Sequence, residues 1–287
     1  HLGFSGYICE ILILYYQSFE AVVKAAAEWQ APQIIEVRGF TDKAQFPNQP
    51  LIIVDPVDAN RNAAAVVNAE NFIKFAAASK QFAAKPSGNF FTPRQQVPMT
   101  AKQINYLMNR GTRFIAIRMK KPDVIDDVLY PQLRKAMKRL RNLLRHSEFS
   151  PLRAYEFADE KNTYIIFELE IFALPPVNNQ EGPPVYAKKH SSDFLAKYRG
   201  KNFVYVDDDR WIAEVKRESR TAVELLSKFL KRDKEKLVAE GVPNYIADVI
   251  ASSQLLEQGE LFSLVRQNKD LSDFLREKYF FDVGKLV

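Results

Sequence analysis

The sequence predicts an α+β protein with a mostly helical first part, antiparallel hairpins in the middle and a helical C-terminal segment. Three observations predict this class. Apolar residues recur at helical spacing over most of residues 1–104. Between residues 150 and 216, two pairs of short apolar runs flank polar turns, which is typical of β-hairpins. Residues 238–287 return to helical spacing.

Residues 3–16, GFSGYICEILILYY, begin with a turn and continue as a helix. The two glycines flank Ser5, so the backbone can turn tightly and come close to a ligand. Ile8 and Leu12 follow at helical spacing while other apolar residues occupy the remaining sides, so we expect a largely buried helix. The plainer interpretation is a turn that caps a core helix.

Residues 51–67, LIIVDPVDANRNAAAVV, predict a strand, a polar loop and an Ala/Val helix. Asp58 suits the N-cap of that helix because its carboxylate can accept from the first free N–H groups. Arg61 and Asn62 would then lie in the first turn, where the helix end favours anions. Simple capping with a surface arginine is the alternative.

The rest of the first part is expected to be helical apart from two short strands. A helix is predicted over residues 19–29, ended by Pro32 because proline lacks the N–H group. Further elements are expected as strands over 34–38 and 51–54, an amphipathic helix over 71–84, and a short helix over 102–110 after a connector.

Residues 112–150 are basic. The alternation over 114–120 predicts a half-buried strand that exposes Arg118 and Lys120. After Pro131 a helix over 130–145 presents one apolar face, and its other faces hold six cations and no acid. These cations are Arg134, Lys135, Lys138, Arg139, Arg141 and Arg145. They indicate either a solvated face or a surface for a polyanion such as RNA.

From residue 150 onward the sequence predicts hairpins over 152–171 and 203–215, separated by a Pro-rich loop over 175–184. A helix near 193–199 and another over 221–231 suggest a ferredoxin-like or RRM-like unit. Five aromatic residues of the hairpins could stack nucleobases, although core packing is the commoner role. They are Tyr155, Tyr164, Phe167, Tyr205 and Trp211. Helices over 238–256, 261–266 and 271–279 are expected to end the chain.

Composition excludes several classes of function. The 287 residues carry a net charge of +6, which permits a polyanionic partner. A single cysteine cannot form an internal disulfide, so a reducing cytoplasm is the expected location. One cysteine and three histidines are also too few for a usual zinc site. No apolar run is long enough for a membrane span.

The run Asp207–Asp209 between two strands is interpreted as a turn rather than a metal site.

Three stretches together resemble the archaeal (class I) CCA-adding enzymes, which are tRNA nucleotidyltransferases. They are GFSGYICE over residues 3–10, DPVD over 55–58 with Arg61 and Asn62, and KPDVIDD over 121–127 followed by LYPQL over 129–133. The resemblance covers most of the chain and weakens after about residue 153. It implies a helical neck domain like the second domain of poly(A) polymerases and oligoadenylate synthetases, then an α/β body and tail.

The resemblance divides the chain into a neck over residues 1–104, the first part of the body over 105–150, a tail over 151–237 and the C-terminal helical body over 238–287. The family's catalytic head would precede residue 1. Its Gly-Ser turn and acidic pair are not found, since the 287 residues contain no Gly-Ser dipeptide. We therefore expect no catalytic or metal-binding residue in this chain, with Mg²⁺ held by the head.

The resemblance also implies the substrates and the residues that bind them. CTP and ATP would add C, C and A to the 3′ end of tRNA, with Tyr7 contacting the triphosphate. Arg61, Asn62 and Lys74 are weaker candidates for the nucleotide or the RNA end. Body and tail would bind the acceptor stem and T-arm through the six cations of 130–145 together with Arg118 and Lys120.

The competing hypotheses differ in partner and activity. The first expects a partner chain that carries the head and no activity from this chain alone. The second is a non-catalytic RNA-binding or scaffold protein of the same architecture, and a weaker third is a poly(A) polymerase of the same superfamily. A homo-oligomer is left open, and no membrane association is expected.

Overall fold

The computed structural model describes residues 3–37, 45–92 and 95–280. The chain folds into two compact units, one made of residues 1–96 with 277–287 and the other of residues 97–276. Each unit is described by itself. The predicted α+β class is confirmed, and the finer division into neck, body and tail stays a prediction.

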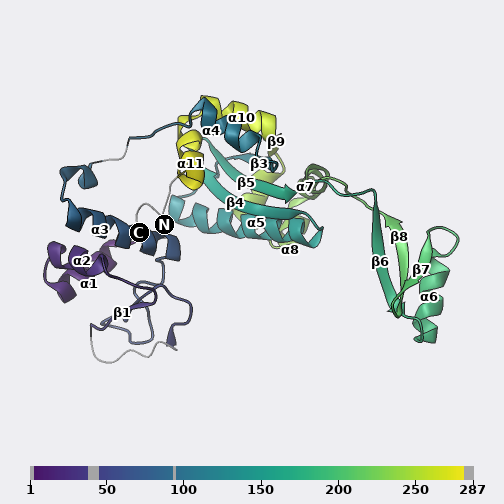
Figure 1. The fold of residues 1–287 in the computed structure, drawn as a ribbon, viewed down its shortest axis with the longest axis horizontal. Coiled ribbons are helices and arrows are strands. Elements are labelled where there is room, and N and C mark those ends of the chain that lie inside the picture. Colours follow the sequence, from purple (N-terminus) through teal and green to yellow (C-terminus); the bar gives the residue numbers. More distant parts are fainter. Residues whose placement is uncertain (1–2, 38–44, 93–94, 281–287) are drawn as a thin grey trace. The chain divides into compact units, whose positions relative to one another are not determined.

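In the described residues, the first unit is built on α-helices and one pair of short strands (Figure 1). Its elements are α1 (Gly6–Tyr16), α2 (Phe19–Ala26), β1 (Gln33–Ile35), β2 (Leu51–Ile53), α3 (Ala69–Ala84) and the 3₁₀ helix η2 (Gly88–Phe91). Strands β1 and β2 pair in parallel. Their apolar residues share a core with α1, α2 and α3 that includes Ile8, Ile35, Ile53 and Phe72.

Local polar residues determine where these helices begin. Ser5 caps α1 by accepting from the Ile8 N–H, and Ser18 caps α2 by accepting from Ala21. Between them Gln17 takes the left-handed conformation at φ 70°, which ends the first helix. The predicted segments over 3–16 and 19–29 are therefore two separate helices.

Two predictions for the first unit were wrong. The helix over 3–16 is confirmed, but it is not largely buried, because Leu14 is 71% exposed and only Ile8, Ile11 and Leu12 are buried. The Ala/Val helix after Asp58 does not form. Residues 58–66 instead make turns, because the Asn62 side chain binds the backbone on both sides of the loop.

The second unit contains the remaining elements. They are α4 (Ala101–Met108), β3 (Arg113–Lys120), α5 (Asp126–His146), β4 (Ser150–Ala158), β5 (Asn162–Ile171), β6 (Val177–Pro184), α6 (Lys188–Tyr198), β7 (Val204–Asp207), β8 (Arg210–Lys216), α7 (Ala222–Leu230), α8 (Lys234–Ala239), α9 (Asn244–Ile250), β9 (Gln254–Glu257), α10 (Gln258–Gln267) and α11 (Lys269–Phe280). The last residues of α11, from Glu277, group with the first unit.

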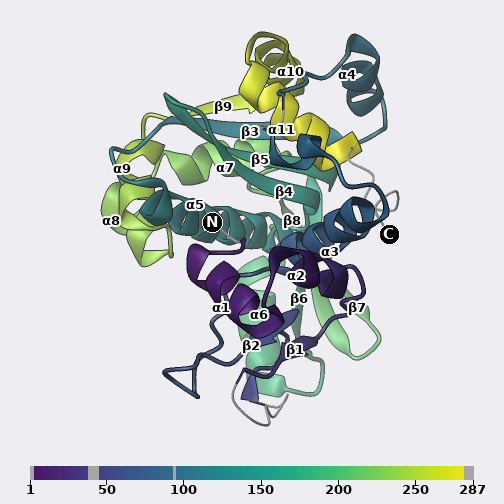
Figure 2. The same cartoon turned by 90° about the vertical axis from the view of Figure 1, so that its left-hand side faces the viewer.

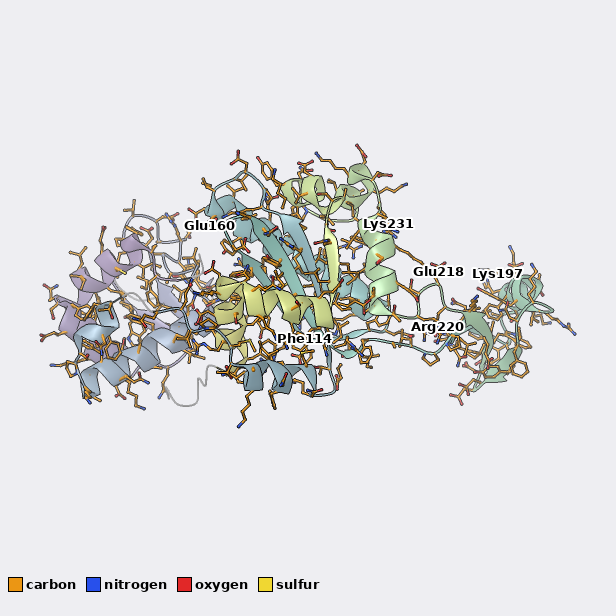
Figure 3. All side chains as sticks on the ribbon, turned by 90° about the horizontal axis from the view of Figure 1, so that it is seen from above. Phe114, Glu160, Lys197, Glu218, Arg220 and Lys231 are labelled. Carbon is orange, nitrogen blue, oxygen red and sulfur yellow. The ribbon has the colours of Figure 1, made fainter. Side chains whose placement is uncertain are left out.

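The central sheet has the antiparallel order β4-β5-β3-β9 and lies between two layers of helices (Figures 1 and 2). On one face Ile117, Phe167 and their neighbours form a core with α5, α7 and α9. On the other face α10 and α11 cover the sheet. Phe114, labelled in Figure 3, packs against Phe262 of α10, and Phe157 packs against Phe274 of α11.

A second, three-stranded sheet has the order β6-β8-β7. Helix α6 packs against it at Gly182, where the Phe194 ring leaves no room for a side chain. The hairpin β7–β8 turns at Asp208 with φ 50°, which confirms the turn predicted for Asp207–Asp209. Lys197, labelled in Figure 3, is exposed on α6.

Several elements of the second unit differ from the prediction. The Pro-rich stretch forms β6, because prolines are tolerated at the end of an edge strand. Helix α5 begins at Asp126, so Pro131 lies inside it rather than in its first turn. The long helix expected over 238–256 breaks at Gly241, with φ 94°, and Pro243. Its last residues form β9, which pairs with β3.

The central sheet also corrects the side-chain exposures that the sequence suggested. Strand β3 is covered on both faces rather than half-buried, since Phe114 and Ile117 are both 0% exposed. Tyr164 and Phe167 are likewise fully buried, so neither presents a ring for base stacking. Tyr155 packs on Phe274 of α11, and Trp211 is half-buried in β8.

Candidate functional site

The two stretches at the start of the first unit meet at one carboxylate. The Tyr7 hydroxyl, in the first turn of α1, donates to Asp55 Oδ1 at 2.9 Å. Arg61 Nη1 lies 3.5 Å from Asp55 Oδ2. Tyr7 and Arg61 were both predicted as nucleotide-binding residues, and Asp55 joins them although it was interpreted only as part of a loop.

Asp55 is buried among groups that favour its charged form. It is 5% exposed, and its Oδ1 also accepts the Val57 N–H at 2.9 Å. The Val57 N–H group lowers the pKa of the Asp55 carboxyl; Tyr7 and Arg61 lower it further against the effect of burial. The hydrogen bond to Asp55 raises the pKa of the Tyr7 phenol above its ordinary value.

Asn62 holds the loop that carries Arg61. Its side-chain oxygen accepts the N–H groups of Ile53 and Ala64, and its Nδ2 donates to the Leu51 carbonyl, each at 2.9 Å. The residue is only 6% exposed. All three of these hydrogen bonds are made within the protein, so the Asn62 side chain shapes the loop.

A hollow of about 590 Å³ lies beside Arg61. Its lining is mixed, with polar residues of the loop and the aromatic residue Phe46. The lining residues are Gln45, Phe46, Pro47, Gln49, Asp58, Asn60, Arg61, Asn62, Ala63, Ala65 and Val66. Tyr7 contacts this loop by its hydrogen bond to Asp55.

Lys74, the fourth predicted nucleotide-binding residue, belongs to another cluster. On α3 it lies 2.8 Å from Glu70 and 3.5 Å from Glu277, and Glu70 also binds Lys278. Burial lowers the pKa of Lys74, but the hydrogen bonds and charges of Glu70 and Glu277 outweigh it, so the pKa is raised. The structure therefore brings Tyr7, Arg61 and Asn62 together and places Lys74 among acids.

Helix α5 carries the predicted RNA-binding cations, and the structure divides them. Lys135, Lys138 and Arg145 are exposed, and within residues 3–37, 45–92 and 95–280 no ion pair involves them. Their positions repeat at three and seven residues, so they follow one stripe of the helix. We call these three residues the basic stripe of α5. Lys120, at the end of β3, is also exposed.

The other predicted RNA-binding residues are engaged by the protein. Arg134 pairs with Glu156 at 3.0 Å, and Arg139 pairs with Glu240 at 3.2 Å. Arg141 is half-buried, and its Nε is enclosed without a hydrogen-bond partner among the described residues. Arg118 Nε donates to Asn162 Oδ1 at 3.3 Å. Removing any of these four would therefore disturb packing as well as surface charge.

Neither a metal cluster nor a membrane-spanning helix is found in the described residues. No group of three or more His, Cys, Asp or Glu side chains in 3–37, 45–92 and 95–280 is placed to hold a metal ion. No helix in the described part of the chain combines the length and the apolar character needed to cross a membrane. These residues thus offer no fit for the Mg²⁺ ions that the resemblance implies.

Comparison with known families matches both units. Residues 1–92 match the family model of the second domain of tRNA nucleotidyltransferases. Residues 110–251 match the model of the C-terminal domain of the CCA-adding enzymes. The first match contains Tyr7, Asp55 and Arg61, and the second contains the basic stripe of α5.

Several curated relatives are archaeal proteins named CCA-adding enzyme. The one from Methanosarcina mazei is 36% identical over 232 residues, which are 79% of this chain and 51% of the relative. The one from Methanothermobacter thermautotrophicus is 37% identical over 231 residues, covering 80% and 50%. The Methanosarcina acetivorans relative is 33% identical over 280 residues, covering 96% and 59%. The chain thus spans about half to three fifths of their length.

Proposed function

The chain belongs to the family of the CCA-adding enzymes, and on that premise we propose that it binds the tRNA and the nucleotide for CCA addition. The reaction would join CTP or ATP to the tRNA 3′ end without a nucleic-acid template. The single observation that carries the nucleotide part is the contact of Tyr7 and Arg61 with one buried carboxylate.

The nucleotide would lie at the surface formed by Tyr7 and Arg61. Tyr7 is 39% exposed and the Arg61 side chain is 64% exposed, so both can reach a ligand. A guanidinium suits phosphate oxygens because it donates two parallel hydrogen bonds. The adjoining hollow of about 590 Å³ is of a size that accepts a nucleoside. Asn62 contributes by holding the loop.

The tRNA would lie on the second unit. The three exposed cations of the basic stripe point away from the protein core and suit the phosphates of an A-form helix, which proteins bind mainly by shape and backbone charge. Lys120 is a further candidate. The four engaged cations would support this surface rather than bind RNA directly.

The 287 residues alone would bind without catalysing. Nucleotidyl transfer requires metal ions held by carboxylates, and the described part of the chain offers no such group. We infer that the carboxylates belong to a catalytic head, supplied by a partner chain or by another part of the same protein. A non-catalytic RNA-binding protein of the same architecture is the competing function.

The test uses the purified 287-residue polypeptide with a tRNA lacking its terminal CCA. We expect binding that weakens steeply as salt rises, and no incorporation of labelled CTP or ATP in the presence of Mg²⁺. Adding the isolated head of an archaeal relative should restore incorporation. Incorporation by the polypeptide alone would refute its inactivity, and absence of tRNA binding would refute the function itself.

A further inference from the structure

We propose that Asp55 is a positioning residue of the nucleotide site, which holds the Tyr7 ring and the Arg61 guanidinium side by side where the triphosphate would bind. This inference rests on the function proposed above. Asp55 is 5% exposed and so acts through the two exposed residues that it contacts. Neither the position nor the neighbours of Asp55 in the sequence distinguish it from the other loop acids.

The two carboxylate oxygens have separate partners. Oδ1 accepts from the Tyr7 hydroxyl and from the Val57 N–H, both at 2.9 Å, whereas Oδ2 faces Arg61 at 3.5 Å. One rigid, planar group therefore sets the spacing between the phenol and the guanidinium. Because Val57 N–H is a backbone donor, the carboxylate is itself anchored to the main chain of the loop.

Hydrogen-bond chemistry shows how the arrangement would work. A phenol has one proton, and here Asp55 accepts it. Triphosphate oxygens are also acceptors, so Tyr7 can bind one only if its hydroxyl turns away from Asp55. Asp55 then still accepts the Val57 N–H at 2.9 Å and faces Arg61 at 3.5 Å, so it is not left buried and unpaired. Asp55 thus fixes the position of Tyr7 in the free protein, and the Tyr7–Asp55 hydrogen bond breaks when the ligand binds.

Two substitutions separate orientation from charge. Asp55→Asn keeps an oxygen that can accept from Tyr7 and Val57 but removes the negative charge. Asp55→Ala removes the acceptor as well. If orientation matters, alanine weakens binding more than asparagine, which still accepts from Tyr7 but presents an amide donor to Arg61. If Asp55 acted only through its charge, the two variants would behave alike.

The experiment measures the affinity of the 287-residue polypeptide for CTP and for inorganic tripolyphosphate. We expect Asp55→Ala to weaken both about tenfold and Asp55→Asn less than about threefold. In a Tyr7→Phe background the loss of affinity from Asp55→Ala should be smaller, because Asp55 then positions only Arg61. Unchanged affinity in Asp55→Ala, or equal losses in the alanine and asparagine variants, would overturn the proposal.

Folding is checked through the amide hydrogen exchange of Ile53 and Ala64, which the Asn62 loop protects. If Asp55→Ala loses this protection, Asp55→Glu replaces it as the test. Glutamate keeps the charge but moves the carboxylate by one methylene, so positioning predicts a similar loss and a pure charge effect predicts none. A wild-type chain that binds neither ligand would instead remove the proposed nucleotide site, and this inference with it.

Discussion

The Tyr7 hydroxyl donates a 2.9 Å hydrogen bond to Asp55 although the two residues are 48 positions apart in the chain. Helix α1 presents the phenol and the loop after β2 presents the carboxylate. Arg61 approaches the same carboxylate from the other end of the loop. Two sequence stretches, residues 3–10 and 55–62, thereby form one surface.

The ionisation of Tyr7 tests this contact directly. The hydrogen bond to Asp55, the burial of the phenol and the negative charge of Asp55 raise the pKa of the Tyr7 phenol. Asp55→Asn should therefore lower that pKa toward its ordinary value. The measurement is a pH titration of phenolate absorbance, with the titration of Tyr7→Phe subtracted to isolate one tyrosine. An identical midpoint in wild type and Asp55→Asn would contradict the contact.

Asn62 should matter for stability. Asn62→Ala leaves the N–H groups of Ile53 and Ala64 without their acceptor in a buried loop. We expect a loss of about 2–4 kcal/mol of local stability, since each unsatisfied buried group costs about 1–3 kcal/mol. Hydrogen exchange at these two amides measures it. Asn60→Ala, at an exposed position of the same loop, is the control and should leave the exchange unchanged.

The basic stripe of α5 should control RNA affinity and its dependence on salt. Replacing Lys135 and Lys138 by glutamate should weaken tRNA binding and reduce the salt slope by about one for each phosphate that is no longer bound. The matched control replaces Lys24 and Lys80, exposed on α2 and α3, with the same change in charge. Equal effects in the two double variants would mean that only net charge matters.

Acid should destabilise the second unit partly through Asp159. Burial alone would raise the pKa of this carboxyl, but hydrogen bonds from the Asn162 and Lys161 backbone and from the side chains of Asn268 and Tyr164 outweigh burial and lower the pKa. A lowered pKa stabilises the fold above the unfolded-state pKa of about 3.9, and this stability is lost as pH falls through the folded value. Chemical denaturation of Asp159→Asn at several pH values should show a weaker acid dependence than wild type.

Alkali should destabilise the second unit partly through Tyr164, which donates a hydrogen bond to Asp159. Burial, then the hydrogen bond to Asp159, raises the pKa of Tyr164 to about 12. A raised pKa stabilises the fold below the ordinary value of about 10, and this contribution is lost as pH rises through the folded value. Tyr164→Phe should remove that alkaline loss in the same denaturation series. If the Tyr164→Phe variant still loses stability at alkaline pH, that loss belongs to other groups.

Gly182 should be intolerant of a side chain. A Cβ built there lies 2.7 Å from the Phe194 ring and 2.8 Å from the Trp211 carbonyl, so Gly182→Ala should cost about 1–3 kcal/mol. Gly259→Ala is the control, because no atom of the described residues lies within 4 Å of its Cβ and α10 acquires a better helix former. Thermal denaturation monitored by circular dichroism compares the two, and equal melting temperatures would contradict the close packing of α6.

Periodicity and turn residues predicted most elements because they are local. Helix α3 and the hairpins β4–β5 and β7–β8 form where the sequence indicates them. The failures arise from distant parts of the chain. Residues 254–257 form a strand because β3 offers them an edge, and β6 extends because β8 lies beside it.

The candidate site shows the same limit. The family resemblance of the GFSG turn and the DPVD loop implied roles for Tyr7 and Arg61, but nothing local indicated that Asp55 contacts both. The cations of α5 were predicted from the charge pattern of one helix together with the family resemblance. Their division into the basic stripe and engaged residues such as Arg139 depends on acids such as Glu240, which lies far along the sequence.

The pairing of β3 with β9 has a consequence for synthesis on the ribosome. Strand β9 is made long after β3, so a growing chain exposes one side of β3 until residue 257 has emerged. During that interval the open strand can join the strands of neighbouring chains. Slower translation or early release upstream of β9 would therefore favour aggregation of the nascent protein.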